Sequence, residues 1–229
     1  MINNPVSKRI SELIKLIPEG KSVADIGTDH GILPIALAKA DRYGEIIATD
    51  ISSESLEKLI IKLNENPYNI QTIVSDGLKA LVEPYPEVVV ISGMGSRLII
   101  KILEESKEIA ENIEIFIFQP NTTVDELRVY LHNNGFSIKD ERCVYENNRH
   151  YSIIVAVHGN EKYEMDCHYK YGKILLENQN PNLKSLLESE KLRFTRLLNT
   201  IDTDANARIN EIKKELEIIQ EALNYYEIT

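Results

Sequence analysis

The chain has 229 residues and a formal net charge of −10, with 43% apolar and 27% charged residues. This length can hold one full domain and a smaller appendage, and the composition is that of a globular protein without a stretch of roughly 20 apolar residues that would span a bilayer. Because residues 1–9 also contain no apolar signal segment, we expect a cytoplasmic protein, and its acidity requires any nucleic-acid partner to meet a local basic cluster.

The first predicted element is an amphipathic helix that begins near Ser7. Apolar residues recur at helical spacing from Val6 to Ile17. Lys8 and Arg9 fall in its first turn, where the helix dipole disfavours cations. Two interpretations of this pair stay open: solvated charges, or contacts to a phosphate beside an active site.

Strand-like and helix-like runs then alternate along the chain, which indicates a parallel, doubly wound α/β sheet. The predicted strands are Ser22–Ile26, Glu45–Thr49, Ile70–Val74, Val88–Ile91 and Glu114–Phe118. The predicted helices are 32–41, 53–64, 96–110 and 122–134.

The pattern changes after Gly135. The runs Phe136–Tyr145 and Tyr151–Val157 follow one another through a turn-like segment, so we expect an antiparallel pair. Five parallel strands closed by such a hairpin form the seven-stranded sheet that is typical of Rossmann-like class I methyltransferases. A simple dinucleotide domain would end in another parallel strand. The predicted domain spans residues 1–160.

Residues 161–229 follow a different period. Apolar residues recur at alternating spacings of three and four over 183–201 and again over 205–226. Segment 202–204 between them predicts a break and an amino-terminal cap. We therefore expect an α-helical coiled-coil hairpin, with a lead-in helix at about 166–178. Its role as a dimerisation arm, a lid or a substrate-binding arm stays open, and so does the choice between monomer and weak dimer.

The most informative motif is Val23–Gly31, followed by Ala48–Asp50. A strand, a glycine-containing turn, a helix and a second strand that ends in an acid form the layout of a βαβ nucleotide site. The dinucleotide fingerprint G-x-G-x-x-G is missing, because only Gly27 and Gly31 are present. Asp25, two residues before the first glycine, indicates S-adenosylmethionine instead and disfavours a nicotinamide dehydrogenase.

Three acids at the ends of successive predicted strands are expected to meet in one methyl-donor pocket. Asp25, with the turn at 27–29, faces the methionine end of the cofactor. Asp50 accepts hydrogen bonds from the ribose, and Asp76 faces the adenine. An acid at one strand end is a common turn residue, whereas three in register are a strong signal. The neighbouring positions predicted to bind the same cofactor are Gly27, Thr28, Ile51, Gly77, Gly93 and Met94.

Two further loops are predicted to face the incoming substrate. The glycines of Ser92–Gly95 allow a backbone carbonyl to approach the reacting centre. Gln119 and Asn121 follow the fifth predicted strand and offer amides that could hydrogen-bond a base edge. For Asn121, capping of the next helix is the favoured alternative.

These motifs resemble those of the bacterial TrmK family, and the resemblance spans the whole chain, including the helical extension. It rests on SKR at 7–9, DIGTDHG at 25–31, ATD at 48–50, SDG at 75–77, SGMG at 92–95 and QPN at 119–121. The resemblance implies transfer of a methyl group from S-adenosylmethionine to N1 of the adenine at position 22 of tRNA.

Within that resemblance, the chemistry suggests roles for the polar residues. Adenine N1 has an available lone pair, and the methylated ring is cationic, so a nearby carboxylate stabilises the late transition state. We hypothesise that Asp29 orients the base or accepts from its amine. His30, Arg9 and Lys8 would hold the nucleotide and its phosphates. The alternative is that Asp29 and His30 cap the next helix or contact the methionine end of the cofactor.

Other functions stay open from the residues alone. A small-molecule methyltransferase would explain the acidity, although the helical hairpin is long and polar for a lid. A non-catalytic binding or assembly module would use that hairpin instead. Cys143 and Cys167 fit no metal-ligand spacing and the five histidines are scattered, so we predict reduced thiols and no metal site.

Overall fold

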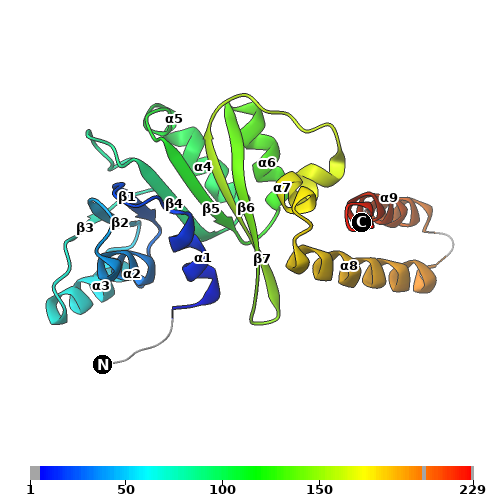
Figure 1. Cartoon of the computed structure of the whole chain (residues 1–229), viewed down its shortest axis with the longest axis horizontal. Helices are drawn as coiled ribbons and strands as arrows, with labels where there is room; N and C mark the ends of the chain where they lie inside the picture. Colours follow the sequence, from blue (N-terminus) through cyan, green and yellow to red (C-terminus); the bar gives the residue numbers. More distant parts are fainter. Residues whose placement is uncertain (1–5, 203–204, 228–229) are drawn as a thin grey trace. The chain divides into compact units, whose positions relative to one another are not determined.

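The computed structural model describes residues 6–202 and 205–227. The chain divides into two compact units. The first comprises Met1–Glu146 and Tyr151–Glu161, and the second comprises Asn147–His150 and Lys162–Thr229. The first unit holds the β-sheet, and the second holds the long helices near the carboxyl terminus (Figure 1).

The sheet has seven strands in the order β3-β2-β1-β4-β5-β7-β6, which confirms the predicted fold class. Strands β1 to β5 pair in parallel, and β7 pairs with β5 antiparallel. The strands are β1 (Val23–Ile26), β2 (Ile46–Asp50), β3 (Ile70–Val74), β4 (Val88–Met94), β5 (Ile115–Pro120), β6 (Phe136–Glu146) and β7 (Arg149–His158).

Helices cover both faces of this sheet, with α1 to α3 on one face and α4 to α6 on the other (Figure 1). They are α1 (Lys8–Leu16), α2 (Ile32–Ala40), α3 (Ser53–Glu65), α4 (Ser96–Glu105), α5 (Lys107–Ala110) and α6 (Val124–Asn133). The single helix predicted over 96–110 was wrong. The backbone leaves the helical region at Ser106, at φ −130° and ψ 38°, and separates α4 from α5.

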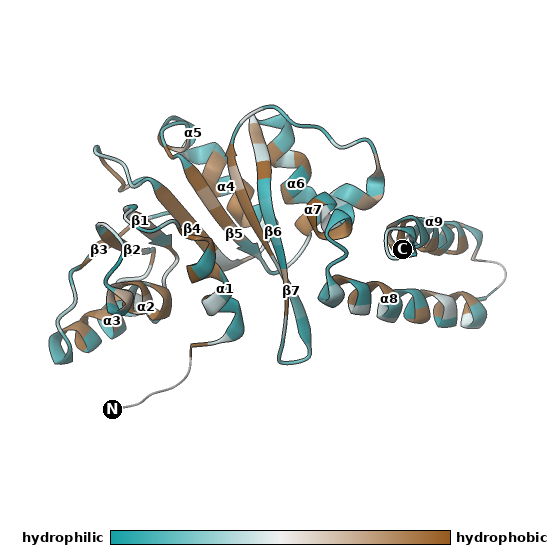
Figure 2. Ribbon diagram, viewed as in Figure 1, coloured by the Kyte–Doolittle hydropathy of each residue, from teal (hydrophilic) through white to brown (hydrophobic). Residues whose placement is uncertain are grey.

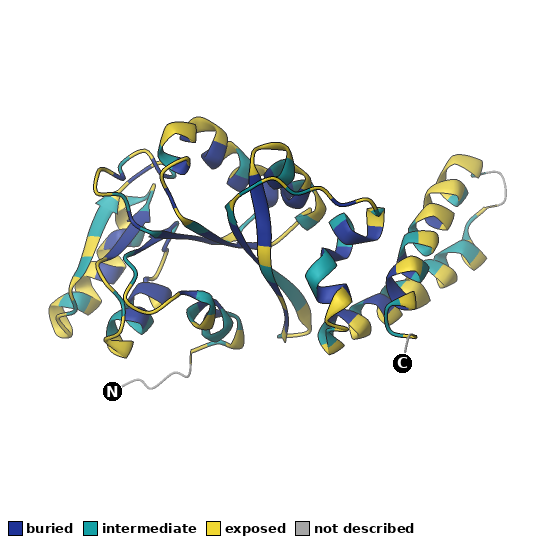
Figure 3. Ribbon diagram, turned by 45° about the horizontal axis from the view of Figure 1, so that its top comes forward, coloured by how far each residue is buried: buried dark blue, intermediate teal, exposed yellow. Residues whose placement is uncertain are grey.

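The central strands read as continuous apolar runs because the sheet is covered on both faces. Strand β4 is apolar over Val88–Ile91 (Figure 2), and these residues are buried, as are all four residues of β1 (Figure 3). Helix α1 adds Ile10 and Leu13 to the core on its face. Ser7 caps this helix by accepting from the Ile10 amide at 3.3 Å, as its place in the sequence predicts.

In the second unit, the lead-in helix expected at 166–178 is a π-helix, η1 (His168–Gly172), followed by α7 (Lys173–Glu177). Two long helices, α8 (Pro181–Thr200) and α9 (Asn206–Asn224), then pack together. Of the predicted cap at 202–204, residues 203 and 204 lie outside the described residues. The residue that precedes α9 is Ala205, which supplies no side-chain cap.

None of the described helices is both long and apolar enough to cross a membrane. The described part of the chain also holds no group of three His, Cys, Asp or Glu side chains that could bind a metal ion. Cys143 and Cys167 are buried free thiols.

A buried ion pair joins α6 to β6. The Arg128 Nε donates to Glu141 Oε1 at 2.8 Å, and the two side chains are 1% and 0% exposed. Removing one partner of such a pair leaves an uncompensated charge in the interior. We predict that Glu141→Ala lowers the free energy of unfolding by about 3–5 kcal/mol in urea denaturation. The double variant Arg128→Met/Glu141→Leu should recover most of that loss, and equal losses in both variants would contradict the assignment.

Candidate active site

A cavity of about 340 Å³ opens at the carboxyl ends of the parallel strands. In doubly wound sheets this edge is where ligands bind. Its walls come from the start of α1, the turn between β1 and α2, the end of β4 and the end of β5. The lining residues are Arg9, Ile10, Asp25, Gly27, Thr28, Asp29, His30, Ile32, Leu33, Ser92, Gly93, Met94 and Asn121.

Gly27 lines this cavity, and two features of its surroundings require glycine. Its φ is +73°, a backbone conformation that costs other residues energy. A Cβ at this position would also lie 2.1 Å from the Met94 Cε. The Gly27 and Thr28 amides both donate to the Thr49 carbonyl, at 2.8 and 2.9 Å. These bonds fasten the turn to β2.

Asp25 ends on the wall of the cavity with 5% of its surface exposed. Burial raises the pKa of this carboxyl from 3.8 to about 6, against a smaller opposing effect of Thr28. The nearby Asp50 carboxylate adds to the rise in pKa. Asp25 and Asp50 therefore act on each other electrostatically, as two acids at neighbouring strand ends should.

Asp50 links the two loops that follow β1 and β2. Its Oδ2 accepts from the Asp29 amide at 3.1 Å, and its Oδ1 accepts from the Ser52 amide at 2.9 Å. Asp29 adopts a φ of +49°, which is uncommon for a residue other than glycine. Its carboxylate lies 3.4 Å from the His30 Nε2. A strained backbone of this kind in a cavity wall is a feature of functional sites.

The alternative that Asp29 or His30 caps α2 is wrong, because Gly31 occupies the cap position and no side chain closes it. The Asp29 side chain is 63% exposed, and both residues line the cavity. The His30 carbonyl accepts from Lys62 Nζ at 2.7 Å, which ties this turn to α3. The exposed carboxylate and imidazole are thus left facing a ligand space.

Asp76 lies outside the residues that line the cavity. Its carboxylate pairs with the ammonium of Lys79, and this hydrogen bond lowers the pKa of Asp76. Lys79 also contacts Glu105 at 2.6 Å. Gly77 takes a φ of +64° next to Asp76, and Ile51 is 70% exposed beyond β2. The structure therefore brings together Asp25 and Asp50 and places Asp76 in an ion pair of its own.

Lys8 and Arg9 are adjacent in the sequence but have different surroundings in the structure. Arg9 lines the cavity, and its Nη1 donates to Gln119 Oε1. Its guanidinium carbon lies 5.4 Å from the centre of the Tyr151 ring. Lys8 is absent from the lining, and its backbone amide donates to the Glu146 carboxylate at 2.6 Å.

Gln119 and Asn121 fill neighbouring positions at the end of β5. Gln119 is fully buried, and its amide is hydrogen-bonded within the protein. Asn121 lines the cavity and donates from Nδ2 to the Gly93 carbonyl at 2.7 Å. The favoured alternative for Asn121, a helix cap, is wrong, because Thr123 precedes α6.

Sequence reasoning missed several lining residues. Ile10 and Leu33 have the spacing of core positions, so nothing in the pattern separates them from other buried apolar residues. Ser92 could have been predicted, because it is the first residue of the glycine-containing loop Ser92–Gly95. Its hydroxyl donates to Gln119 Oε1 at 3.2 Å.

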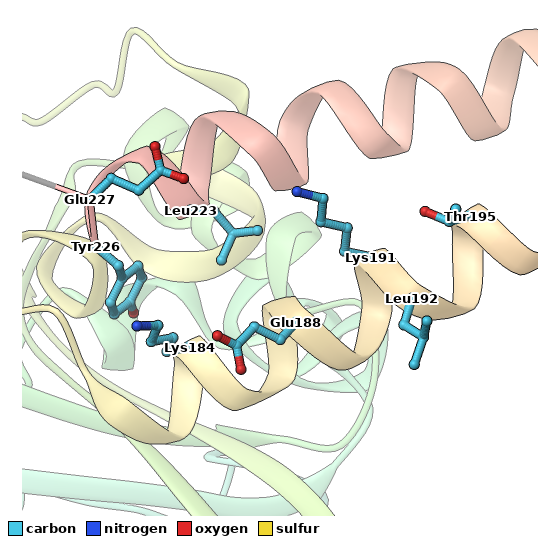
Figure 4. Close-up of a pocket in the computed structure, with 8 residues that line it drawn as sticks. All are labelled: Lys184, Glu188, Lys191, Leu192, Thr195, Leu223, Tyr226 and Glu227. Atoms are coloured by element: carbon cyan, nitrogen blue, oxygen red, sulfur yellow. The ribbon is translucent and has the colours of Figure 1, made fainter.

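The second unit carries a larger open groove of about 510 Å³ along α8 and the end of α9 (Figure 4). Two lysines, Lys184 and Lys191, face it together with Glu188 and Glu227. These charges balance, and none of the predicted site residues lies there. The chemistry of the chain is concentrated in the smaller cavity of the first unit.

A seven-stranded sheet with a ligand cavity at the carboxyl edge defines the class I methyltransferase fold. Residues 6–154 match the family described as a methyltransferase domain, so the chain belongs to that family. It is 34% identical over 154 residues to a putative tRNA methyltransferase of Mycoplasma genitalium, over 66% of this chain and 69% of that protein.

Two further relatives confirm the resemblance inferred from the motifs. The tRNA (adenine(22)-N(1))-methyltransferase of Bacillus subtilis is 25% identical over 233 residues, which are 96% of this chain and 98% of that protein. The structure of a putative tRNA (m1A22) methyltransferase of Streptococcus pneumoniae in complex with S-adenosyl-L-methionine matches with a TM-score of 0.86 and 26% identity. That match covers 96% of this chain and 100% of the other.

The raised pKa of Asp25 predicts a dependence of stability on pH. The folded protein holds this proton up to about pH 6, whereas the unfolded chain loses it near 3.8. The contribution of Asp25 to stability therefore falls as pH rises through this window, by up to about 3 kcal/mol. We expect Asp25→Asn to gain stability relative to wild type between pH 4 and 7 in denaturant titrations. A stability difference that is constant with pH would contradict the burial of an ionisable Asp25.

Proposed function

We propose that this protein transfers a methyl group from S-adenosylmethionine to N1 of an adenine in tRNA, at position 22. The observation that carries the proposal is the cavity beside the glycine turn of β1, with Asp25 buried in its wall and Asp29 exposed in it. The names of the relatives at 34%, 25% and 26% identity support this substrate class.

The residues of the cavity fit the methyl donor. When bound, this cofactor supplies an electrophilic methyl group on a sulfonium. Gly27 has no Cβ, so the Met94 methyl group packs against the turn, and the amino-acid end of the cofactor would lie beside these two residues. Burial disfavours the ionised form of the Asp25 carboxyl, and an ammonium or sulfonium charge bound beside it would offset that cost. Thr28, Gly93 and Met94 complete this part of the wall.

For the rest of the cofactor we propose the strand ends beside the cavity. Asp50 keeps acceptor capacity for the ribose hydroxyls, since each of its oxygens receives one backbone amide. The exposed Ile51 side chain offers an apolar surface for the adenine. Asp76 and Gly77 would contact the exocyclic amine. The Asp76 carboxylate, which accepts a hydrogen bond from Lys79, would then accept one from this amine as well.

The substrate adenine approaches from the side of Asp29 and His30. Its N1 lone pair needs no strong base, so alignment with the methyl group supplies most of the catalysis. The ring becomes cationic as the bond forms, and the exposed Asp29 carboxylate stabilises that charge. N1 is the pairing edge of adenine, so the base has to leave its stack before it reacts. Arg9 and Asn121 would hold the extruded nucleotide, and Lys8, which lies outside the cavity, would contact a phosphate.

A tRNA substrate implies that this activity takes place in the cytoplasm.

Gly27→Ala tests the fit of the cofactor, with Gly20→Ala as a matched control. Gly20 has a φ of +80° and no atom within 4 Å of an added Cβ, so its substitution imposes backbone strain alone. Both variants should lose about 1–2 kcal/mol of stability. Only Gly27→Ala, which also displaces Met94, should weaken S-adenosylmethionine binding at least tenfold by isothermal titration. Equal cofactor affinity in both variants would remove Gly27 from the binding site.

The reaction itself is tested with tRNA transcripts and labelled S-adenosylmethionine. We expect 1-methyladenosine in the nucleosides of the digested RNA by mass spectrometry, and none from a transcript with guanine at position 22. Label in a different nucleoside would contradict the proposed position. Label in small molecules alone would favour a small-molecule methyltransferase, and absence of cofactor binding would favour a binding module.

A further inference from the structure

Gln119 is the point at which two walls of the cavity meet. The residue ends β5, is fully buried, and makes four hydrogen bonds with its side-chain amide. Its Oε1 accepts from Arg9 Nη1 and from the Ser92 hydroxyl, the latter at 3.2 Å. Its Nε2 donates to the Pro120 carbonyl and to Asn121 Oδ1, both at 3.1 Å. A primary amide has two donors and two acceptor positions, so none is left for a substrate.

Three of these partners face the cavity, although Gln119 itself does not line it. Arg9 comes from α1, Ser92 from the end of β4, and Asn121 from the loop after β5. Asn121 extends the network, because its side-chain Nδ2 donates to the Gly93 carbonyl at 2.7 Å. Its backbone N–H donates to the Met94 carbonyl, also at 2.7 Å. One buried amide therefore connects residues about 110 positions apart in the chain (Arg9 and Gln119 differ by 110).

The network leaves Arg9 suited to bind a ligand. The guanidinium has five N–H donors, and Gln119 takes one at Nη1. The Tyr151 ring lies 5.4 Å away and restrains the same group. A free arginine side chain loses conformational entropy when it is ordered. Here that ordering precedes binding, which is the physical benefit of a preorganised side chain.

We propose that Gln119 is a positioning residue for the RNA nucleotide. It orients the Arg9 guanidinium and the Asn121 amide toward the substrate and makes no contact with the substrate itself. The anionic group that Arg9 recognises is a nucleotide phosphate of the flipped-out adenosine, because the planar guanidinium can donate two parallel hydrogen bonds to phosphate oxygens. This inference rests on the proposed function and deepens it, because it reassigns the Gln119 amide from contacting a base edge to holding Arg9 and Asn121, which contact the nucleotide.

The test is a double-mutant cycle on steady-state tRNA methylation with Gln119→Met and Arg9→Ala. Met keeps the length of Gln and removes all four hydrogen bonds. We expect Gln119→Met to raise KM for tRNA by about 10–100-fold, the range seen when supporting residues are removed, and to change cofactor affinity less than about twofold. If Gln119 acts through Arg9, the KM of the double variant for tRNA should exceed that of the more impaired single variant by no more than about threefold.

Ile117→Val on the same strand serves as the matched control, because it removes one buried methylene at a residue that does not line the cavity. It should lower the melting temperature while keeping wild-type KM for tRNA. Wild-type KM in Gln119→Met would overturn the proposal, and so would effects that multiply in the double variant.

A readout without RNA separates this inference from the proposed function. In NMR spectra of the ¹⁵N-arginine-labelled protein, the Arg9 guanidinium of wild type should give signals of a rotationally restricted group. Gln119→Met should release that restriction. Unchanged Arg9 signals would overturn the positioning role even if wild-type protein methylates tRNA. Loss of the restriction beside a wild type that methylates no RNA would support it and refute the proposed substrate.

Discussion

The site depends on a left-handed turn at the end of one buried parallel strand. Gly27 leaves β1 at a φ of +73° and directs the chain away from the sheet, where Thr49 of β2 accepts both of the amides that follow Ile26. The absence of a Cβ lets the Met94 methyl group rest against the turn. β1 pairs with β2 and β4, and the turn after it lines the cavity together with the end of β4 and the loop after β5.

Electrostatics at that turn favour a cationic ligand. Asp25 is buried beside the cavity, and its pKa is raised first by that burial and then by Asp50. An unpaired carboxylate in such a place costs free energy, and a positive charge bound in the cavity offsets the cost. In this protein of net charge −10, the cavity thus offers a place for a cation beside Asp25, while Arg9 supplies local positive charge in the same cavity.

The order and type of the elements in the first unit were predictable, because alternating strands and helices leave strong periodic signals. The strand ends were placed to within a few residues, since buried parallel strands are continuous apolar runs. Helix interruptions were not predictable. Ser106 breaks α4 from α5 without glycine or proline, and the cap of α2 is a glycine although Asp29 precedes it closely.

The candidate site shows a similar contrast between features that local sequence determines and features that depend on the fold. Backbone-determined features such as the turn at Gly27 and the acids at strand ends can be predicted from local sequence. Side-chain partners cannot, because they depend on which distant residues the fold brings within hydrogen-bonding distance. The Gln119 amide, for example, accepts from Arg9, 110 positions away in the chain. Nothing in the sequence indicates that pairing, whereas the ion pair of Asp76 and Lys79 joins residues only three positions apart.

The central claim is that the turn after β1 holds the methyl donor. A crystal structure of this protein with S-adenosylhomocysteine tests it most directly. The account predicts the amino-acid end of the ligand against Gly27 and Asp25, with a ribose hydroxyl within hydrogen-bonding distance of an Asp50 oxygen. Density for the ligand in the groove along α8, or anywhere away from this turn, would contradict it.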